Sequence, residues 1–190
     1  MRKVILYMQI SLDGVVSDPE RWMTLSDDII EDKIEFYSTL DTVVFGSHTY
    51  PSQAEYWQNA EKFTLSMVEK KFAETINTIN KIVISRTPLD LIWRTSQQLI
   101  FRDNDDFISK IQDLKNTSGK NISVESGIHT WILFLQNSLF DEMHLFVHPV
   151  IAGSGQKLFS EIEAKSIMQL KNARIYQNGV MALQYERKCI

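Results

Sequence analysis

Residues 4–10 read Val-Ile-Leu-Tyr-Met-Gln-Ile, and this apolar stretch decides the fold class. It does not alternate between apolar and polar side chains, which is typical of a strand that is covered on both faces. Shorter runs of the same kind follow at residues 42–45, 82–84 and 122–124, each ended by a small or polar residue. The four runs predict the inner strands of a mainly parallel sheet.

Apolar residues at helical spacing fill the segments between these strands. The first predicted helix covers residues 28–40, and its Ile30, Ile34 and Tyr37 lie on one face. Further helices are predicted over residues 65–79, 107–114 and 128–139. The alternation of strands and helices predicts one domain over residues 1–190, in which helices cover both faces of the sheet.

The last third of the chain predicts antiparallel strands. Residues 143–151 form a long strand pattern, and residues 173–176 and 180–185 flank Asn178-Gly179. Asn-Gly suits the type I′ turn of a two-residue hairpin. The complete pattern therefore predicts a three-layer αβα fold with a mixed, mainly parallel sheet that ends in an antiparallel hairpin.

Composition and charge limit the classes of partner. The chain has 190 residues, 44% hydrophobic and 23% charged, which is typical of a globular protein. Its formal net charge of −4 argues against a nucleic-acid surface, which needs clustered Lys and Arg. Cys189 is the only cysteine, so the sequence predicts neither an internal disulfide nor a Cys/His metal site. No apolar stretch reaches the roughly 20 residues of a membrane helix. We expect a cytoplasmic protein that binds small molecules and no nucleic acid, membrane or metal.

Polar turns follow three of the predicted strands, at the ends where α/β sheets bind ligands. These turns are Gly46-Ser47-His48-Thr49, Ser85-Arg86-Thr87 and Glu125-Ser126-Gly127-Ile128. Backbone and hydroxyl donors, together with the Arg86 cation, can bind phosphate groups. Each turn taken alone is also explained by helix capping. Their joint occurrence at three strand ends predicts a phosphate-bearing ligand.

Several other chemistries are disfavoured. Gly153-Ser154-Gly155 is the only Gly-x-Gly, and it lacks the third glycine of the dinucleotide-binding fingerprint. No serine occupies a Gly-x-Ser-x-Gly elbow, which argues against nucleophilic hydrolysis. Hydride transfer needs mainly orientation, exclusion of water and one proton-handling group, and the sequence has residues for those tasks.

A set of segments that runs through most of the chain resembles one known family. The segments are Ser11-Leu12-Asp13-Gly14, residues 41–46 with His48-Thr49-Tyr50, Ile84-Ser85-Arg86-Thr87, Asp141-Glu142, residues 148–155 and Leu158-Phe159. They are similar to the dihydrofolate reductase superfamily, and within it to the C-terminal reductase domain of the riboflavin-biosynthesis (RibD) deaminase-reductases and its stand-alone bacterial relatives. The resemblance implies a dihydrofolate reductase-like fold, NADPH as cofactor and a homodimer.

The resemblance also implies roles for individual residues. Residues that would hold the phosphates of NADPH are Gly46, Ser47, His48, Thr49, Ser85, Arg86, Thr87, Ser126, Gly127 and Ile128. Residues that fall where relatives line the nicotinamide or contact the substrate are Gln9, Val16, Ser17, Asp13 and Trp22. The acid that assists protonation would be Glu125 or one of Asp27, Asp28 and Glu31.

Three positions depart from the family pattern. Ser126-Gly127 stands where relatives usually carry Gly-Gly, a pair that dihydrofolate reductases join by a cis bond. Ser47 stands where many relatives have a basic residue, so Arg86 is left to distinguish NADPH from NADH, and NADH stays an alternative. Gln9 replaces a small residue beside the nicotinamide, so either the substrate differs or the pocket is tighter.

The leading functional hypothesis is an NADPH-dependent reductase of a pterin-like or aminopyrimidine substrate, similar to 5-amino-6-(5-phosphoribosylamino)uracil reductase. One alternative is a dihydrofolate reductase, and another is a non-catalytic nucleotide-binding protein on the same fold. Purely structural roles are open for Asp13 as a turn brace, and for Asp27 and Asp28 as helix caps. Trp22 lies in residues 17–26, which read either as a mobile active-site loop or as a plain connection, and it is the tryptophan expected to face a ligand.

Overall fold

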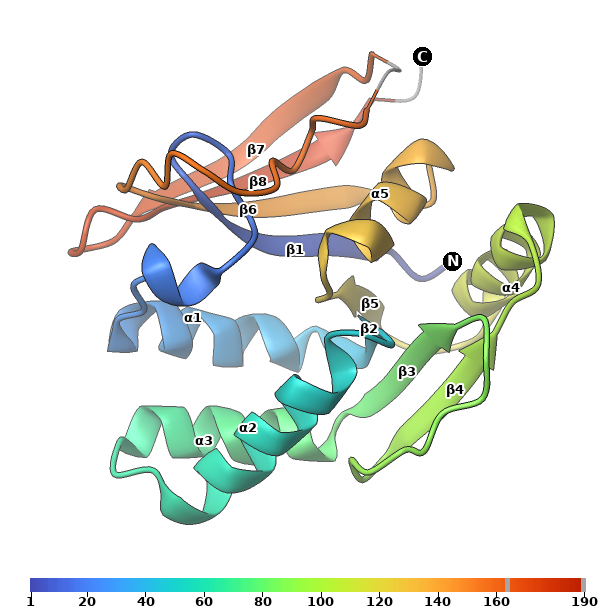
Figure 1. Ribbon diagram of the computed structural model, residues 1–190, viewed down its shortest axis with the longest axis horizontal. Coiled ribbons are helices and arrows are strands. Elements are labelled where there is room, and N and C mark those ends of the chain that lie inside the picture. Colours follow the sequence, from blue (N-terminus) through green and yellow to red (C-terminus); the bar gives the residue numbers. More distant parts are fainter. Residues whose placement is uncertain (163–164, 189–190) are drawn as a thin grey trace.

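One eight-stranded sheet organises the computed structural model, which describes residues 1–162 and 165–188 (Figure 1). The strands are β1 (Val4–Ser11), β2 (Leu40–Gly46), β3 (Asn80–Ser85), β4 (Ser96–Ile100), β5 (Asn121–Val124), β6 (Glu142–His148), β7 (Met168–Ile175) and β8 (Met181–Arg187). The helices are α1 (Asp27–Ser38), α2 (Tyr50–Phe63), α3 (Met67–Thr78), α4 (Asn104–Asn116) and α5 (Ile128–Gln136), with a short 3-10 turn, η1 (Pro19–Arg21).

The strand order is β4-β3-β2-β5-β1-β6-β8-β7. β1 lies inside the sheet between β5 and β6 and pairs with both in parallel, which confirms the prediction from its apolar run. The strands on the β4 side are also parallel to their neighbours, whereas β8 is antiparallel to both β6 and β7. The predicted mixed sheet with a closing antiparallel hairpin is therefore confirmed.

Two apolar layers lie on opposite faces of the sheet. Leu6 and Met8 of β1 point to one layer, which also contains side chains of α4 and α5. Ile5 points to the other layer, which α1, α2 and α3 cover. Successive side chains of a strand point to opposite faces, so a continuous apolar run is what a strand between two helix layers requires.

Two elements and several element boundaries differ from the sequence prediction. α2 was not predicted, because only Tyr50, Ala54 and Ala60 of its fourteen residues are buried and two of these are alanines. β4 was not predicted, because it is a short edge strand with no buried residue. The predicted boundaries extend too far at the C-terminal ends of α1, α5 and β6, whose last residues are Ser38, Gln136 and His148.

The prediction of a type I′ turn between β7 and β8 is wrong. Of the two residues Asn178 and Gly179, only Gly179 has a positive φ, of 84°, whereas a type I′ turn needs two. The N–H of Gly179 donates to the carbonyl of Tyr176, and the N–H of Tyr176 donates to that of Val180. This pattern is a three-residue loop whose last residue is left-handed, and glycine satisfies it without strain.

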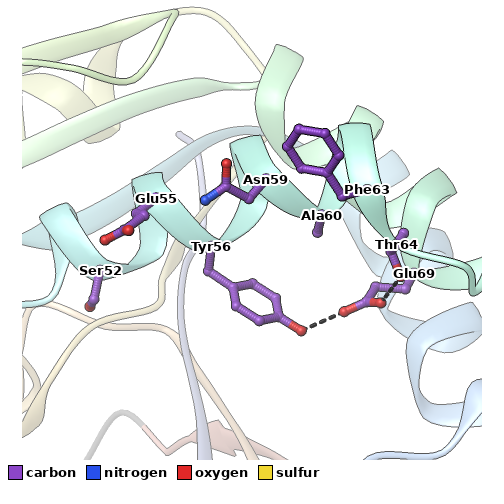
Figure 2. A pocket seen from close by; sticks show the side chains of 8 residues that line it. All are labelled: Ser52, Glu55, Tyr56, Asn59, Ala60, Phe63, Thr64 and Glu69. Atoms are coloured by element: carbon purple, nitrogen blue, oxygen red, sulfur yellow. Dashed lines mark hydrogen bonds between the residues drawn. The ribbon is translucent and has the colours of Figure 1, made fainter.

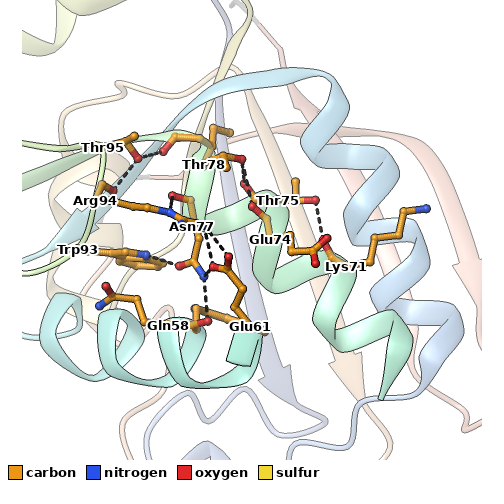
Figure 3. Close-up of polar contacts among 12 residues, drawn as sticks. Gln58, Glu61, Lys71, Glu74, Thr75, Asn77, Thr78, Trp93, Arg94 and Thr95 are labelled. Carbon is orange, nitrogen blue, oxygen red and sulfur yellow. Dashed lines mark hydrogen bonds and ion pairs between the residues drawn. The ribbon is translucent and has the colours of Figure 1, made fainter. Parts of the chain in front are cut away.

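A buried amide anchors the connection between β3 and β4 to the two helices below it (Figure 3). The Asn77 side chain donates to the carbonyl of Trp57, at 3.0 Å, and accepts from the indole Nε1 of Trp93, at 2.5 Å. Arg94 donates to the Asn77 carbonyl and pairs with Glu61 of α2. These bonds hold the connection that begins with the predicted phosphate turn after β3.

The described ranges contain neither a membrane-spanning helix nor a cluster of metal-binding side chains. No helix there has both the length and the apolar character that crossing a bilayer requires. No three His, Cys, Asp or Glu side chains in this part of the chain are grouped so that they could hold a metal ion. Cys189 lies outside the described residues.

Candidate active site

The three predicted phosphate turns lie at one edge of the sheet. They follow β3, β2 and β5, which are consecutive neighbours and mutually parallel. The hydroxyl of Ser126 links two of the turns, since its Oγ accepts the N–H of Gly46 at 2.6 Å and lies 3.2 Å from Oγ1 of Thr49. The structure therefore brings these residues together as the sequence predicted.

The backbone of these turns approaches the start of α5 closely. A Cβ atom on Gly46 would overlap the Oγ1 of Thr130 and lie 2.8 Å from the Oγ of Ser126. Gly127 is the N-cap of α5, and a Cβ on it would lie 3.1 Å from the methyl of Thr49. No peptide bond in the described ranges is cis, so the Ser126-Gly127 bond is trans. The N–H groups of Thr130 and Trp131 donate to the carbonyl of Gly127, whereas those of Ile128 and His129 have no acceptor within the helix and are available to a ligand.

The turn after β3 presents a cation. Ser85 is buried, donates to the carbonyl of Thr87 at 2.6 Å and accepts from the side chain of Gln98. Arg86 is exposed, and its guanidinium lies 5.5 Å from the ring centroid of Phe101. Ser85 thus fixes the turn, while Arg86 remains accessible to an anionic ligand. In the turn after β2, His48 is also exposed.

Asp13 joins the first loop of the chain to the loop after β6. Its carboxylate accepts from the hydroxyl of Ser11 and from the backbone N–H groups of Ala152, at 2.9 Å, and Gly153, at 3.1 Å. The Ser11 hydroxyl, followed by these backbone donors, holds the pKa of Asp13 below its usual range. These bonds support a structural role for Asp13, in which its carboxylate braces the two loops. The contact of Asp13 with a substrate stays a prediction.

Val16 and Ser17 lie in the continuation of this loop, against residues 155–157. The N–H of Val16 donates to the carbonyl of Gln156, and the Ser17 hydroxyl accepts the N–H of Gln156. A Cβ on Gly155 would lie 2.6 Å from a methyl of Val15. The two loops therefore pack backbone against backbone, and Val16 and Ser17 are half-buried there.

Trp22, the tryptophan expected to face a ligand, is buried in this structure. Only 3% of its surface is exposed, and its Nε1 donates to the carbonyl of Ser17. The indole ring packs edge-on against His148, at 5.4 Å between ring centroids. In this conformation Trp22 is part of the support for residues 17–26 and offers no free face to a substrate.

His148 connects this loop to Gln9. Its Nδ1 accepts the N–H of Thr24 at 3.1 Å, so the proton of the neutral ring is on Nε2, which donates to the Oε1 of Gln9 at 2.7 Å. Burial lowers the pKa of His148 to about 4. The amide of Gln9 is thereby oriented with its oxygen toward His148. This contact was not predicted, because it joins residues 139 positions apart in the sequence.

The four predicted acids have different surroundings. Asp27 and Glu31 are exposed on α1. Asp28 accepts from the Ser26 hydroxyl and from the N–H of Ile29, and the Ser26 bond is the main reason that its pKa is low. Glu125 is the buried acid, with 10% of its side chain exposed, and its Oε2 lies 2.8 Å from the Nζ of Lys33. The structure therefore singles out Glu125 and does not bring the α1 acids to it.

Lys33 and two tyrosines around Glu125 were not predicted. The hydroxyl groups of Tyr7 and Tyr37 are buried and have no hydrogen-bond partner of good geometry among the described residues. Burial, followed by the charge of Glu125, raises the pKa of both phenols well above 10. Lys33 shares the inward face of α1 with Ile34 and Tyr37. A lysine on the apolar face of a helix was the sequence signal, because such a cation needs a partner inside the protein.

Comparison with known proteins shows the family of the chain. The RibD C-terminal domain matches residues 2–182 of the chain. The chain belongs to this family. The RibD C-terminal domain match spans β1 to β7 and the start of β8, and the predicted site residues lie within its range.

Individual relatives show how broad the similarity is. The uncharacterized protein YyaP of Bacillus subtilis strain 168 is 26% identical over 187 residues, which cover 97% of this chain and 94% of YyaP. RibD of Acinetobacter baumannii superposes with a TM-score of 0.69 at 18% identity, covering 100% of this chain and 59% of RibD. The riboflavin biosynthesis reductase Rib7 of Saccharomyces cerevisiae superposes with a TM-score of 0.59 at 14% identity, over 98% and 90% of the two chains. These structures share the dihydrofolate reductase-like fold.

Two hollows of the fold are lined by residues other than the predicted site residues. One groove of about 540 Å³ runs along the outer side of α2, where Tyr56 and Thr64 both bond to Glu69 (Figure 2). A second hollow of about 450 Å³ lies between α1 and the antiparallel strands, and Tyr7 and Lys33 line part of it. Neither contains a residue of the predicted cofactor site.

The residues at the strand ends fit a dinucleotide phosphate. The start of α5 supplies backbone donors beside Gly46 and Thr49, and a helix N-terminus attracts anions. Arg86 supplies a cation one strand further along the sheet, where a second phosphate would lie. The backbone donors at the start of α5 and the Arg86 cation thus follow neighbouring strands. This spacing suits an elongated ligand that carries more than one phosphate.

Proposed function

We propose that this member of the RibD C-terminal domain family is an NADPH-dependent reductase of a pterin-like or aminopyrimidine substrate, with NADH as an alternative cofactor. The observation that carries the proposal is the position of three donor-rich turns on the adjacent strands β3, β2 and β5, with the buried acid Glu125 at the start of the third turn. The specific substrate that the resemblance implies is 5-amino-6-(5-phosphoribosylamino)uracil.

The chain's own residues would divide the work. Bound NADPH would supply a hydride. Gly46, Thr49 and the start of α5 bind the pyrophosphate, and Arg86 binds the 2′-phosphate. The amide of Gln9, oriented by His148, would lie beside the nicotinamide, and His148 links it to Thr24 in residues 17–26, which would help to exclude water there.

Dihydrofolate reduction is the main alternative function. The two functions differ in the acidic residue that each would use. Dihydrofolate reduction would use an acid at the start of α1, where Asp27 and Glu31 are exposed and Asp28 is bonded to Ser26. Glu125 directly follows β5 beside the cofactor turns, and its ion pair with Lys33 favours the reductase of a pterin-like or aminopyrimidine substrate. Replacing Asp27, Asp28 and Glu31 one at a time should leave turnover of an accepted substrate within about threefold of wild type, whereas a large loss at one of them would favour a dihydrofolate reductase.

Calorimetric titration with NADPH and NADH tests the proposal. We expect micromolar binding of NADPH, followed by oxidation of NADPH in the presence of one member of a pterin and aminopyrimidine panel. If neither cofactor binds at micromolar concentration, the reductase proposal is wrong. Binding without oxidation across the whole panel would favour a non-catalytic nucleotide-binding protein.

We also propose a homodimer, as the resemblance implies. β7 is an edge strand, and seven of its eight residues are exposed. A long exposed edge with free backbone groups is a site for pairing with another strand. Sedimentation equilibrium should give a mass of twice 22.1 kDa, and a monomer at micromolar concentration would contradict the proposal.

A further inference from the structure

Lys33 lies on the inward face of α1 among aromatic rings. Its Nζ is 4.9 Å from the ring centroid of Tyr7, 4.8 Å from that of Phe72 and 5.8 Å from that of Tyr37. The side chain is 19% exposed, and its one ion pair among the described residues is with Glu125. An ammonium group has three donors, so Lys33 keeps N–H groups for a partner beyond Glu125.

Glu125 is held as an acceptor at both oxygens. Oε2 accepts from Lys33 at 2.8 Å, and Oε1 accepts from the hydroxyl of Ser123 at 3.2 Å. A carboxylate in an ion pair carries no proton to give, so the pair argues against Glu125 itself as the proton donor. Glu125 directly follows β5 and precedes Ser126, so it holds the Lys33 nitrogen at the edge where the cofactor turns lie.

The other groups nearby are poor proton donors or are already engaged. The phenols of Tyr7 and Tyr37 have pKa values raised well above 10 by burial. Asp32 accepts from Arg174 at 2.6 Å and from the hydroxyl of Tyr176 at 2.7 Å. Lys33 is therefore the protonated group with donors to spare.

The orphaned hydroxyls indicate that the Lys33–Glu125 pair faces a polar ligand atom. Buried hydroxyls normally have a hydrogen-bond partner, because leaving one unpaired costs about 1–3 kcal/mol. The hydroxyls of Tyr7 and Tyr37 make no hydrogen bond of good geometry among the described residues, although that of Tyr37 lies near Glu125 and that of Tyr7 near Gln9. Both rings contact the Lys33 ammonium. A nitrogen or oxygen acceptor of a heterocyclic substrate, placed beside Lys33, would satisfy this need.

We propose that Lys33 is the catalytic proton donor of this site and that Glu125 is its positioning residue. The proposal rests on the reductase function proposed above. The hydride becomes a new C–H bond at the carbon of a C=N or C=O group, and the π electron pair of that group moves to its nitrogen or oxygen. That atom takes a proton from the Nζ of Lys33, which becomes a neutral amine and regains a proton from water at its exposed end.

Four variants test the role of Lys33. Lys33→Met removes the donor, and Lys33→Arg keeps a cation. Lys33→Met combined with Glu125→Gln removes the donor without leaving a buried unpaired carboxylate, which guards against loss of folding. Lys70→Met, on the exposed side of α3, is the matched control. Thermal unfolding and calorimetric NADPH affinity are measured for each variant.

The kinetic readout uses NADPH with 7,8-dihydrofolate, 7,8-dihydropterin and 5-amino-6-(5-phosphoribosylamino)uracil as probes. We expect Lys33→Met and the double variant to lower kcat by about 100-fold or more, the size of general acid catalysis, with KM raised by no more than about tenfold and NADPH affinity within about threefold of wild type. Lys33→Arg should recover part of the loss. As a readout independent of turnover, quenching of pterin fluorescence in the presence of NADP⁺ should show about tenfold weaker binding to Lys33→Met than to the Lys70→Met control.

Each outcome decides the question. If Lys33→Met and the double variant both keep kcat within threefold of wild type, Lys33 is not the donor and the reductase function stands. If the wild type binds NADPH but oxidises it with none of the three probes, the proton-donor role is overturned while the cofactor site survives. If the wild type does not bind NADPH, the proposed function fails and the inference fails with it.

Discussion

The carboxylate of Asp13 accepts the backbone N–H of Ala152 at 2.9 Å. This bond joins two segments that lie 139 residues apart in the sequence and that both carry the resemblance to the family. Ser-Leu-Asp-Gly and Pro-Val-Ile-Ala-Gly-Ser-Gly are thus two halves of one structure. The acid of the first segment caps the backbone of the second, and Gly153 and Gly155 supply the positive φ values of 78° and 137° that the second needs.

Replacing Asp13 by Asn should lower the stability of the protein. An amide can accept at one oxygen, but its NH₂ group would face the N–H of Gly153, so a backbone donor would be left unpaired. Because the pKa of Asp13 is lowered by folding, its contribution is complete above the unfolded value of about 4 and is lost as the pH falls through the folded value. Thermal unfolding of wild type and Asp13→Asn should therefore differ at pH 7 and converge toward pH 3. An equal difference at both pH values would contradict the ionised brace, and Asp90→Asn, at an exposed position, is the control.

Gly46→Ala should destabilise the fold through a local clash. The new methyl would overlap the Oγ1 of Thr130 at the start of α5. Overpacking of this kind costs roughly 1–3 kcal/mol, and urea unfolding measures it. Combining Gly46→Ala with Thr130→Ala should recover part of the loss, whereas additive losses would show that the clash lies elsewhere.

Arg86→Ala should reduce discrimination between the cofactors. The exposed guanidinium is the cation proposed for the 2′-phosphate, and a hydrogen bond to a charged group contributes about 1.5–3 kcal/mol. We expect NADPH affinity to fall at least about tenfold while NADH affinity is unchanged, as measured by calorimetry. Arg102→Ala, which removes an exposed cation paired with Asp106, should leave both affinities unchanged. Equal losses for both cofactors would place the 2′-phosphate elsewhere.

The buried imidazole of His148 should make stability depend on pH in the acidic range. Its folded pKa of about 4 lies below the unfolded value of about 6.5, so the unfolded chain binds more protons between these values. The free energy of unfolding should therefore decrease as the pH falls from 6.5 toward 4, by up to about 1.4 kcal/mol per pH unit. His148→Gln should remove this part of the slope, and His129→Gln, at an exposed position on α5, should keep it. A slope that is unchanged in His148→Gln would contradict the assignment.

The parts of the fold that are defined by burial on both faces could be predicted from the sequence. β1, β2, β3 and β5 have continuous apolar runs, so their parallel arrangement followed from the pattern. β4 could not be predicted in this way, because an edge strand is half solvated and its Ser-Gln-Gln-Leu-Ile has no distinctive periodicity. α2 was missed for a related reason, since alanine contributes little to an apolar stripe.

The site was predictable where chemistry follows the strand ends, and not where it depends on contacts between distant segments. The turns at Gly46, Arg86 and Ser126 were found because each directly follows a strand. Lys33 was missed, because its partner Glu125 is brought to it only when α1 packs on the sheet. The burial of Trp22 could not be predicted, because it depends on packing against His148, which lies 126 positions further along the sequence.

The central position of β1 imposes an order on the assembly of the chain. Its two neighbours in the sheet lie far along the chain, in residues 121–124 and 142–148. Contacts of such long sequence separation form slowly, because a large loop must close before they are made. During synthesis β1 therefore has both edges unpaired until residues 121–124 have emerged and one edge unpaired until residues 142–148 have emerged. Folding of the nascent chain thus exposes this apolar strand to aggregation.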